Sequence, residues 1–159
     1  MLKKALLTLT CIAMATSALA KEVTIPTARG DVTLSAPPAK IAVFDTGSLD
    51  TLQALGVKVD GAADVAKLLP YLKPTLDSAK NVGTIFEPNL EALNELKPDL
   101  IIVGTRTAKK FDDVSAIAKT IDLTDNGDKL VESGIQRIDS FGRLFDKQAA
   151  ADKLNWKPY

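Results

Sequence analysis

Strand-like apolar runs alternate with helical patterns between residues 40 and 123, and this alternation constrains the fold more than any other feature. "KIAVFD" and "DLIIVGT" are continuous apolar runs bounded by polar residues, as expected of strands that are buried on both faces. Each is followed by a segment with apolar residues at helical spacing, such as "SLDTLQALG". This alternation predicts βαβ units and a mostly parallel sheet with helices on both faces. We therefore predict the α/β fold class, as a three-layer lobe.

Patterns on either side complete the predicted organisation. "EVTIPTARGDVTLSAPP" predicts a hairpin of two short strands around residues 28–31. "KLLPYLKPTLDSA" predicts a short helix broken by prolines, and residues 128–154 carry one long helical pattern. The apolar stripe of that long helix contains Ile138, Phe141, Leu144, Phe145 and Leu154.

The first twenty residues have the pattern of a cleaved secretory signal peptide. Lys3 and Lys4 provide a positive start, "ALLTLTCIAMA" is a short apolar core, and "ALA" supplies small residues before Lys21. The core is too short for a stable membrane anchor, and the alternative is a buried N-terminal helix. Cys11 lies inside this segment, so we expect the secreted chain to contain no disulfide.

Composition argues against several classes of function. Without residues 1–20 the chain has 18 Lys and Arg against 20 Asp and Glu, and this net charge of −2 favours neither nucleic acid nor an anionic membrane as a partner. The whole sequence contains no histidine. This absence removes the usual general base, the Ser-His-Asp and Cys-His nucleophile systems, and the commonest ligand of zinc and iron. We assign no metal ligands and no catalytic residues.

The motif "DTGS" at residues 45–48 raises the question of a catalytic aspartate. An aspartic protease needs two carboxylates that share a proton in a β-rich cleft, whereas this motif occurs once and precedes a helical pattern. A phosphatase of the haloacid dehalogenase type would have a second Asp where Gly47 stands. We interpret Asp45 as a strand-end residue whose carboxylate caps or hydrogen-bonds the following turn, with Ser48 as a candidate helix N-cap and Gly56 as the helix stop. A small secreted hydrolase that uses Asp45 is the alternative.

The tripeptide "VGT" occurs at residues 82–84 and 103–105, each time at the carboxyl end of a predicted strand. Ligands of open α/β sheets bind at that edge. Neither stretch has the glycine spacing of a dinucleotide-binding or phosphate-binding loop. Arg106 follows the second copy, with Lys109 and Lys110 one turn further on. A guanidinium there can form paired hydrogen bonds to an anion and stack on an aromatic ring, and the alternative is a solvated arginine bonded to a neighbouring Asp.

Three blocks of the sequence, taken in order, resemble periplasmic ferric-siderophore-binding proteins, the substrate-binding components of ABC importers in which a rigid helix joins two lobes. The blocks are "VFDTGSLDTLQALGV", "VGTIFEPNLEALNELKPDLIIVGTRTAKKFDDVSAIAKTIDLT" and "RIDSFGRLFDKQAAADKL". The resemblance covers residues 23–154. It implies a periplasmic, non-enzymatic, monomeric protein without a cofactor. Such a protein binds a ferric siderophore, here of the catecholate type, and delivers it to an inner-membrane permease.

The resemblance also implies which residues contact the ligand. Arg106 matches a basic residue that holds the tri-catecholate iron complex, a trianion of aromatic rings that suits a guanidinium. Glu91 matches a surface glutamate that docks onto arginines of the permease, and its alternative is an ordinary solvated charge. The rest of the ligand-binding wall is expected at Thr46, Gly47, Ser48, Thr84, Phe86, Thr105 and Lys109.

Proteins of that family have a second lobe after the linking helix, whereas this sequence ends at Tyr159. We therefore expect a signal peptide (1–20), an N-terminal ligand-binding lobe (21–127) and a linking helix (128–159) with the second lobe absent. We expect this half-cleft to bind ligand weakly or not at all. We also expect the apolar stripe near Phe141 and Phe145 to lack some of its cover and to cause some self-association. An interaction protein that binds no small ligand is a further alternative.

Overall fold

The described part of the chain begins with an antiparallel hairpin, as predicted. The computed structural model describes residues 21–155, so the predicted signal peptide lies outside the described residues. The hairpin consists of β1 (Lys21–Thr27) and β2 (Gly30–Ala36). Val23, Ile25 and Leu34 are its buried side chains. Gly30 closes the turn with a φ of 98°, a left-handed conformation that favours glycine.

Five short parallel strands form the central sheet, in the order β5-β4-β3-β6-β7. They are β3 (Ile41–Val43), β4 (Gly61–Ala62), β5 (Lys80–Asn81), β6 (Leu100–Val103) and β7 (Thr120–Asp122). Every residue of β3 and β6 is buried, which explains why these strands are continuous apolar runs in the sequence. The α/β class and the parallel sheet predicted from the sequence are confirmed.

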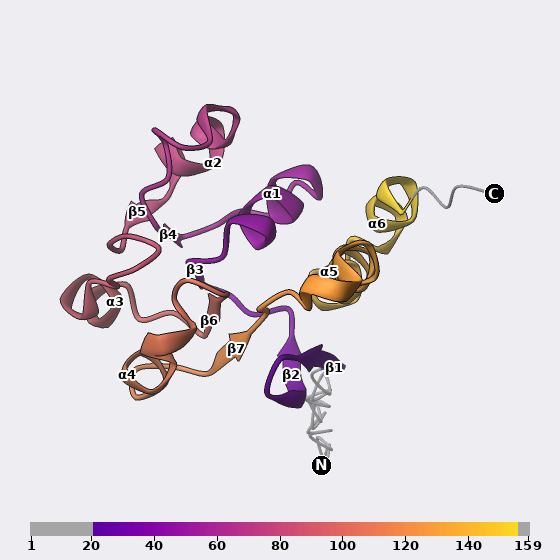
Figure 1. The fold of residues 1–159 in the computed structure, drawn as a ribbon, viewed down its shortest axis with the longest axis horizontal. Coiled ribbons are helices and arrows are strands. Elements are labelled where there is room, and N and C mark those ends of the chain that lie inside the picture. Colours follow the sequence, from indigo (N-terminus) through magenta and orange to yellow (C-terminus); the bar gives the residue numbers. More distant parts are fainter. Residues whose placement is uncertain (1–20, 156–159) are drawn as a thin grey trace, which may run out of the picture.

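Helices cover both faces of this sheet, with α1 and α2 on one side and α3 and α4 on the other (Figure 1). Their bounds are α1 (Thr46–Ala54), α2 (Lys73–Ser78), α3 (Leu90–Leu96) and α4 (Phe111–Ser115). The connections from β3 through β4 to β5 run across the sheet in one direction, and those from β5 through β6 to β7 run in the other. Right-handed connections in opposite directions place their helices on opposite faces, which gives the three layers. Single 3-10 turns precede α2 and α4, namely η1 (Pro70–Leu72) and η2 (Ala108–Lys110).

The start of α1 agrees with the prediction for Asp45 and differs from that for Ser48. Asp45, not Ser48, is the N-cap, because its carboxylate accepts a hydrogen bond from the Ser48 backbone nitrogen at 2.7 Å. The Ser48 hydroxyl donates to the same carboxylate oxygen at 2.6 Å. The strand-end carboxylate therefore satisfies one free amide of the first turn, and the helix begins directly after it. Gly56 follows the helix as predicted, with a φ of 67°.

The single long helix predicted over residues 128–154 is broken into two. The segment consists of η3 (Gly127–Lys129), α5 (Leu130–Leu144) and α6 (Gln148–Leu154). Asp146 has a φ of 54°, and the Lys147 amide donates to the Gly142 carbonyl at 2.8 Å. These two features form a Schellman turn that ends α5. Lys21 of the hairpin contacts this turn through a 2.8 Å ion pair with Asp146.

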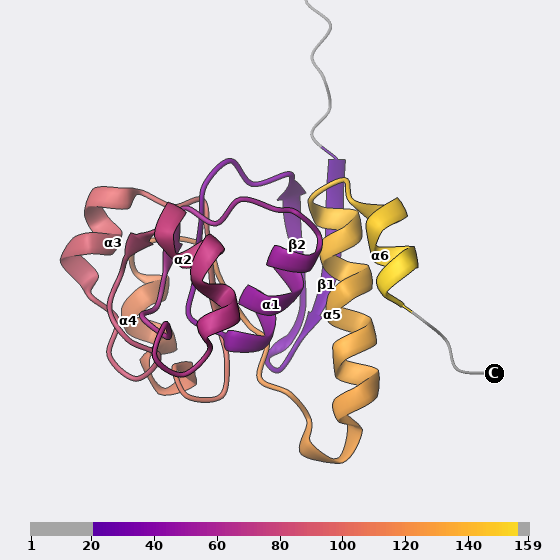
Figure 2. The ribbon, with the colours of Figure 1, turned by 90° about the horizontal axis from the view of Figure 1, so that it is seen from above.

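The second helix, α6, packs closely on α5 because Gly142 has no side chain. A Cβ at this position would lie 2.6 Å from the Cβ of Ala151, which is fully buried. Figure 2 shows α5 alongside β1 and β2, with α6 on its outer side. Gly142 is a poor helix former, yet it is the residue at which the two helices make close contact.

The apolar stripe near Phe141 and Phe145 packs against the core, so the expectation that it lacks some of its cover is wrong there. Leu154, the last member of the predicted stripe, is 38% exposed. Phe141 is fully buried and meets Phe145 edge to face, with 5.8 Å between ring centroids. The most exposed apolar side chains of α5 lie at its start, where Leu130 and Val131 are 61% and 76% exposed. That end of α5 extends beyond the rest of the lobe (Figure 2).

Within residues 21–155 no helix is long and apolar enough to cross a membrane.

Candidate functional site

The candidate site lies at the carboxyl ends of β3 and β6, the two central strands. Within the sheet, β3 lies between β4 and β6. The chain passes from β3 directly to β4, whereas it reaches β6 only later, from β5. The loops after β3 and β6 therefore lead to opposite faces of the sheet, which opens the crevice where ligands of such sheets bind. A cavity of about 170 Å³ lies there. It is lined by Phe44, Asp45, Thr46, Gly47, Ile85, Gly104, Thr105, Arg106 and Asp125.

Half of the predicted ligand-binding residues line this cavity, namely Thr46, Gly47, Thr105 and Arg106. Ser48 does not, because it is fully buried beneath the turn and its hydroxyl is bonded to Asp45.

The remaining predicted residues lie outside the cavity lining. Thr84, Phe86 and Lys109 are exposed on the neighbouring loops after β5 and β6. Glu91 is exposed in the first turn of α3, away from the cavity.

Arg106 is exposed on the cavity and differs from the other arginines in its partners. Each of the other three forms an ion pair with a carboxylate: Arg29 with Asp122, Arg137 with Asp125, and Arg143 with Asp139. No ion pair or hydrogen bond joins the Arg106 side chain to another residue between positions 21 and 155. Its guanidinium is therefore available to a ligand instead of bonding a neighbouring Asp.

Two of the loops around the cavity are joined to each other. The buried Thr107 hydroxyl donates to the Ile85 carbonyl, which connects the loop after β6 with the loop after β5. Lys110 adds a 2.9 Å ion pair with Glu87, and this contact raises the pKa of the Lys110 ammonium. The loop after β5 also closes on itself, since the Thr84 hydroxyl oxygen accepts from the Glu87 amide at 3.0 Å. These contacts hold the exposed loop beside the cavity in one conformation.

The Asp45 carboxylate lies at the base of the cavity. Burial raises the pKa of this carboxyl above its ordinary value, while the hydrogen bonds from Ser48 and the charge of Arg137 oppose that rise. Gly104 lies directly against the carboxylate, and a Cβ there would collide with it. The loop after β6 therefore needs a glycine at this position to approach the end of β3.

Two residues of the site, Asp125 and Arg137, are missing from the predictions. Asp125 follows β7 and lines the cavity, and the Arg137 guanidinium reaches it from α5. One signal in the sequence points to Arg137: it precedes Phe141 by four residues and Leu144 by seven, so it shares their buried helical stripe. The sequence-based prediction named Arg106 as the arginine of the cleft and missed Arg137, because only the fold brings α5 beside the end of β3.

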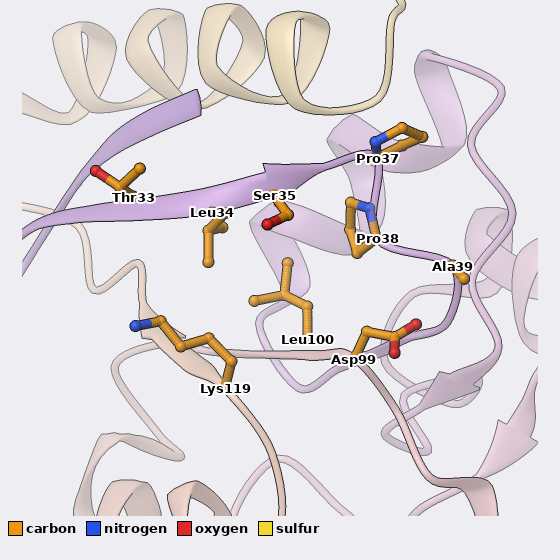
Figure 3. A pocket seen from close by; sticks show the side chains of 9 residues that line it. All are labelled: Thr33, Leu34, Ser35, Pro37, Pro38, Ala39, Asp99, Leu100 and Lys119. Atoms are coloured by element: carbon orange, nitrogen blue, oxygen red, sulfur yellow. The ribbon is translucent and has the colours of Figure 1, made fainter. Parts of the chain in front are cut away.

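A larger cavity, of about 470 Å³, lies at the opposite, amino edge of the sheet. It separates β2 from the starts of β6 and β7, and Leu34 and Leu100 form its base (Figure 3). Its charged groups are Lys119 and Asp99, and the Asp99 carboxylate already accepts from the Lys40 amide at 2.8 Å. The smaller cavity is the candidate site, because it lies at the switch point and polar side chains from the loops after β3, β6 and β7 converge there.

No group of three or more His, Cys, Asp or Glu side chains within the described range 21–155 is arranged to hold a metal ion. The side chains of Thr46, Thr105 and Arg106 at the cavity offer hydrogen bonds and positive charge.

The doubly wound sheet and the charged crevice at its switch point define an α/β lobe with a candidate ligand site. The chain belongs to the periplasmic binding protein family, whose pattern it matches over residues 41–157. The family is one of binding proteins.

Individual relatives carry more specific names. The petrobactin-binding protein YclQ of Bacillus subtilis is 39% identical over 113 residues, which are 70% of this chain and 36% of that protein. The ferric-anguibactin-binding protein FatB of Vibrio anguillarum is 30% identical over 130 residues, which are 78% of this chain and 40% of FatB. The crystal structure of the periplasmic catecholate-siderophore-binding protein VctP of Vibrio cholerae has a TM-score of 0.75 and 31% identity, covering 84% of this chain and 48% of VctP. The chain thus spans less than half the length of each of these relatives.

Proposed function

We propose that this protein is the substrate-binding component of an iron-siderophore importer and that its cavity contacts a ferric siderophore of the catecholate type. The relatives named above, which bind petrobactin, ferric anguibactin and a catecholate siderophore, support this ligand class. The observation that carries the proposal is the position of Arg106, an exposed arginine at the switch-point cavity without a carboxylate partner in residues 21–155.

The charges around the cavity explain why Arg106 decides anion binding. At the base, the carboxylates of Asp45 and Asp125 face the single guanidinium of Arg137, so that part of the site repels an anion. Arg106 and Lys109, both exposed, supply positive charge at the entrance. A planar guanidinium can bond catecholate oxygens in pairs and stack on the rings, which an ammonium cannot do.

The neighbouring loops supply the remaining contacts in this proposal. Thr46, Gly47 and Thr105 form the wall nearest Arg106. The Phe86 ring, 61% exposed, offers an aromatic face on the loop after β5, next to Thr84. A cavity of about 170 Å³ is smaller than the roughly 300–1,000 Å³ of typical ligand pockets, so this lobe would contact one side of the ligand and bind it weakly.

The proposal extends to location, organisation and partner. Residues 1–20 direct secretion to the periplasm and are removed, residues 21–127 form the ligand-binding lobe, and residues 128–159 form the linking segment. Glu91, exposed at the start of α3, docks onto the permease. The protein performs no catalysis in this proposal, and its free form is monomeric with some tendency to self-associate.

The test is equilibrium dialysis of the protein, expressed as the full 159-residue chain and purified from the periplasmic fraction. It is dialysed against ferric catecholate and ferric hydroxamate complexes. We expect saturable catecholate binding that weakens about tenfold or more in Arg106→Ala, since a hydrogen bond to a charged group contributes roughly 1.5–3 kcal/mol. Arg106→Lys should restore only part of the affinity.

Lys119→Ala is the matched control, because Lys119 is an exposed cation on the larger cavity at the amino edge. Catecholate binding that depends on Lys119 and not on Arg106 would show that the ligand binds in the cavity at the amino edge, which would contradict this proposal. Hydrolytic turnover that disappears in Asp45→Asn would favour a secreted hydrolase instead.

A further inference from the structure

Arg137 connects three parts of the molecule beneath the candidate site. Its side chain is 10% exposed and reaches from α5 to the loops after β3 and β7. Nη2 donates a hydrogen bond to the Asp125 carboxylate. Nε lies 3.9 Å from the Asp45 carboxylate, close enough for charge attraction but too far for a hydrogen bond. We refer to Asp45, Asp125 and Arg137 as the Arg137 bridge.

The backbone beside the bridge is shaped to receive the guanidinium. A Cβ at Gly47 would lie 2.5 Å from Nη1 of Arg137, so the guanidinium lies directly against the backbone of this turn. Gly47 and its neighbour Thr46 line the cavity, which means that Arg137 supports the ligand-facing wall from behind. The Arg137 Nε is buried without a hydrogen-bond partner among residues 21–155. A small shift of the turn toward α5 would give this donor the Asp45 carboxylate as acceptor.

The charges of the bridge also depend on one another. Asp45 and Asp125 come from different loops and repel each other, and the guanidinium between them offsets that repulsion. Arg106, from the loop after β6, lines the same cavity. Removing the Arg137 charge would therefore leave two carboxylates with only the exposed Arg106 to balance them, and the loops after β3 and β7 would move apart.

We propose that Arg137 is a positioning residue that fixes the turn at residues 45–47 and the loop at Asp125 relative to α5. A movement of α5 then changes the ligand-facing wall, so the helix and the site are coupled through one side chain. The ligand part of this inference rests on the proposed siderophore function, whereas the geometric part does not.

Nuclear magnetic resonance tests the geometric part on the protein purified from the periplasmic fraction, without any ligand. Arg137→Gln should shift the backbone amide signals of Asp45, Thr46, Gly47 and Asp125. It should also raise the pH midpoint of the Asp45 carboxyl, because the Arg137 charge lowers the pKa of that group. Arg143→Gln is the matched control on the same helix, since Arg143 bonds Asp139 and the Thr24 carbonyl instead of the site.

Two further variants keep the test decisive. Arg137→Lys retains the charge, so we expect it to restore the Asp45 midpoint but not all of the amide positions. Gly47→Ala displaces the guanidinium from the other side, so we expect it to shift the Asp125 amide even if Arg137→Gln fails to fold. The proposal is wrong if these signals keep their wild-type positions. It is also wrong if Arg143→Gln moves them equally, because that result indicates general loosening of α5.

Dialysis against a ferric catecholate complex tests the ligand part. Arg137→Gln should weaken binding by roughly tenfold, the lower end of the effect that supporting residues have at metal sites, while Arg143→Gln binds like the wild type. Wild-type affinity in Arg137→Gln would overturn the coupling to the ligand. If the wild-type protein binds no complex, the proposed function fails, and the spectra alone then decide whether Arg137 positions the turn.

Discussion

Asp45 shows how one residue can serve the fold and the site at the same time. Its carboxylate caps α1 through Ser48 and forms the base of the cavity. Capping favours a hydrogen-bond acceptor at this position, whereas burial disfavours a negative charge. These two effects can be separated, because asparagine retains the acceptor and loses the charge.

We predict that Asp45→Ala lowers the free energy of unfolding by about 1 kcal/mol more than Asp45→Asn does, which is the usual contribution of an N-cap. Urea unfolding at pH 7 measures both variants. Asp31→Asn, at an exposed carboxylate of the hairpin, controls for the general effect of losing a negative charge. Equal losses in the two Asp45 variants would show that the cap contributes nothing.

We also predict that the difference in stability between Asp45→Asn and the wild type depends on pH. The pKa of Asp45 is raised above its ordinary value of 3.8, so the folded protein binds this proton more tightly than the unfolded chain does. The resulting stability is fully present below pH 3.8 and is lost as the pH rises through the folded pKa. The unfolding free energy of Asp45→Asn minus that of the wild type should therefore increase with pH across this window. A difference that decreases would mean that Arg137 lowers the pKa more than burial raises it.

At the scale of elements, the junction of α5 and α6 depends on close contact. The turn at Asp146 reverses the chain, and Gly142 lets Ala151 approach the surface of α5. Helix propensity favours alanine over glycine at any interior helical position, whereas packing opposes it at a contact this tight.

We predict opposite effects for two glycine substitutions in the same helix. Gly142→Ala should lower the free energy of unfolding by about 1–3 kcal/mol, because the new methyl group meets Ala151. Gly134→Ala should raise it by up to about 1 kcal/mol, because nothing lies within 4 Å of a Cβ there. Chemical unfolding of both variants measures the difference. Stabilisation by both substitutions would show that α6 moves away from α5 without cost.

At the scale of the whole molecule, several exposed apolar side chains lie in the segments that follow the carboxyl ends of strands, either in loops or at the start of α5. Leu68 follows β4, Phe86 follows β5, and Leu130 and Val131 follow β7. Exposed apolar groups gathered at one edge favour association with another surface.

We predict concentration-dependent self-association that Val131→Glu reduces, because this substitution places a charge on the most exposed of these side chains. Sedimentation velocity over a hundredfold range of concentration measures it. Glu132→Gln, one position further along and also exposed, is the control. A protein that stays monomeric throughout would show that these side chains are simply solvated.

The sequence predicts the sheet and the order of its elements well, because buried parallel strands carry a strong local signal. "IAV" of β3 and "LIIV" of β6 are entirely apolar. Each helical pattern between consecutive strands is short enough to be one helix. It fails at the break between α5 and α6. Asp146 in a left-handed conformation is uncommon for a residue other than glycine, so no local pattern marks the turn.

The candidate site is predicted only in part. Arg106 and Thr46 follow directly from strand ends, where position along the chain determines position in space. Arg137 is separated from Asp45 by 92 positions, and only the packing of α5 on the sheet brings the two together. Ser48 is misplaced because a serine near a helix start suggests a cap, whereas the preceding carboxylate has that role.

The bond from Thr107 to Ile85 has a consequence for anyone who wishes to redesign the ligand preference of this scaffold. It joins residues 83–88 and 104–110 into one unit, so the two segments should be exchanged together. Grafting the first loop alone from a relative would risk leaving a buried hydroxyl without its acceptor. Grafting both would carry the contact along, so a chimera should be built by swapping the pair, with the turn at residues 45–47 as a second module.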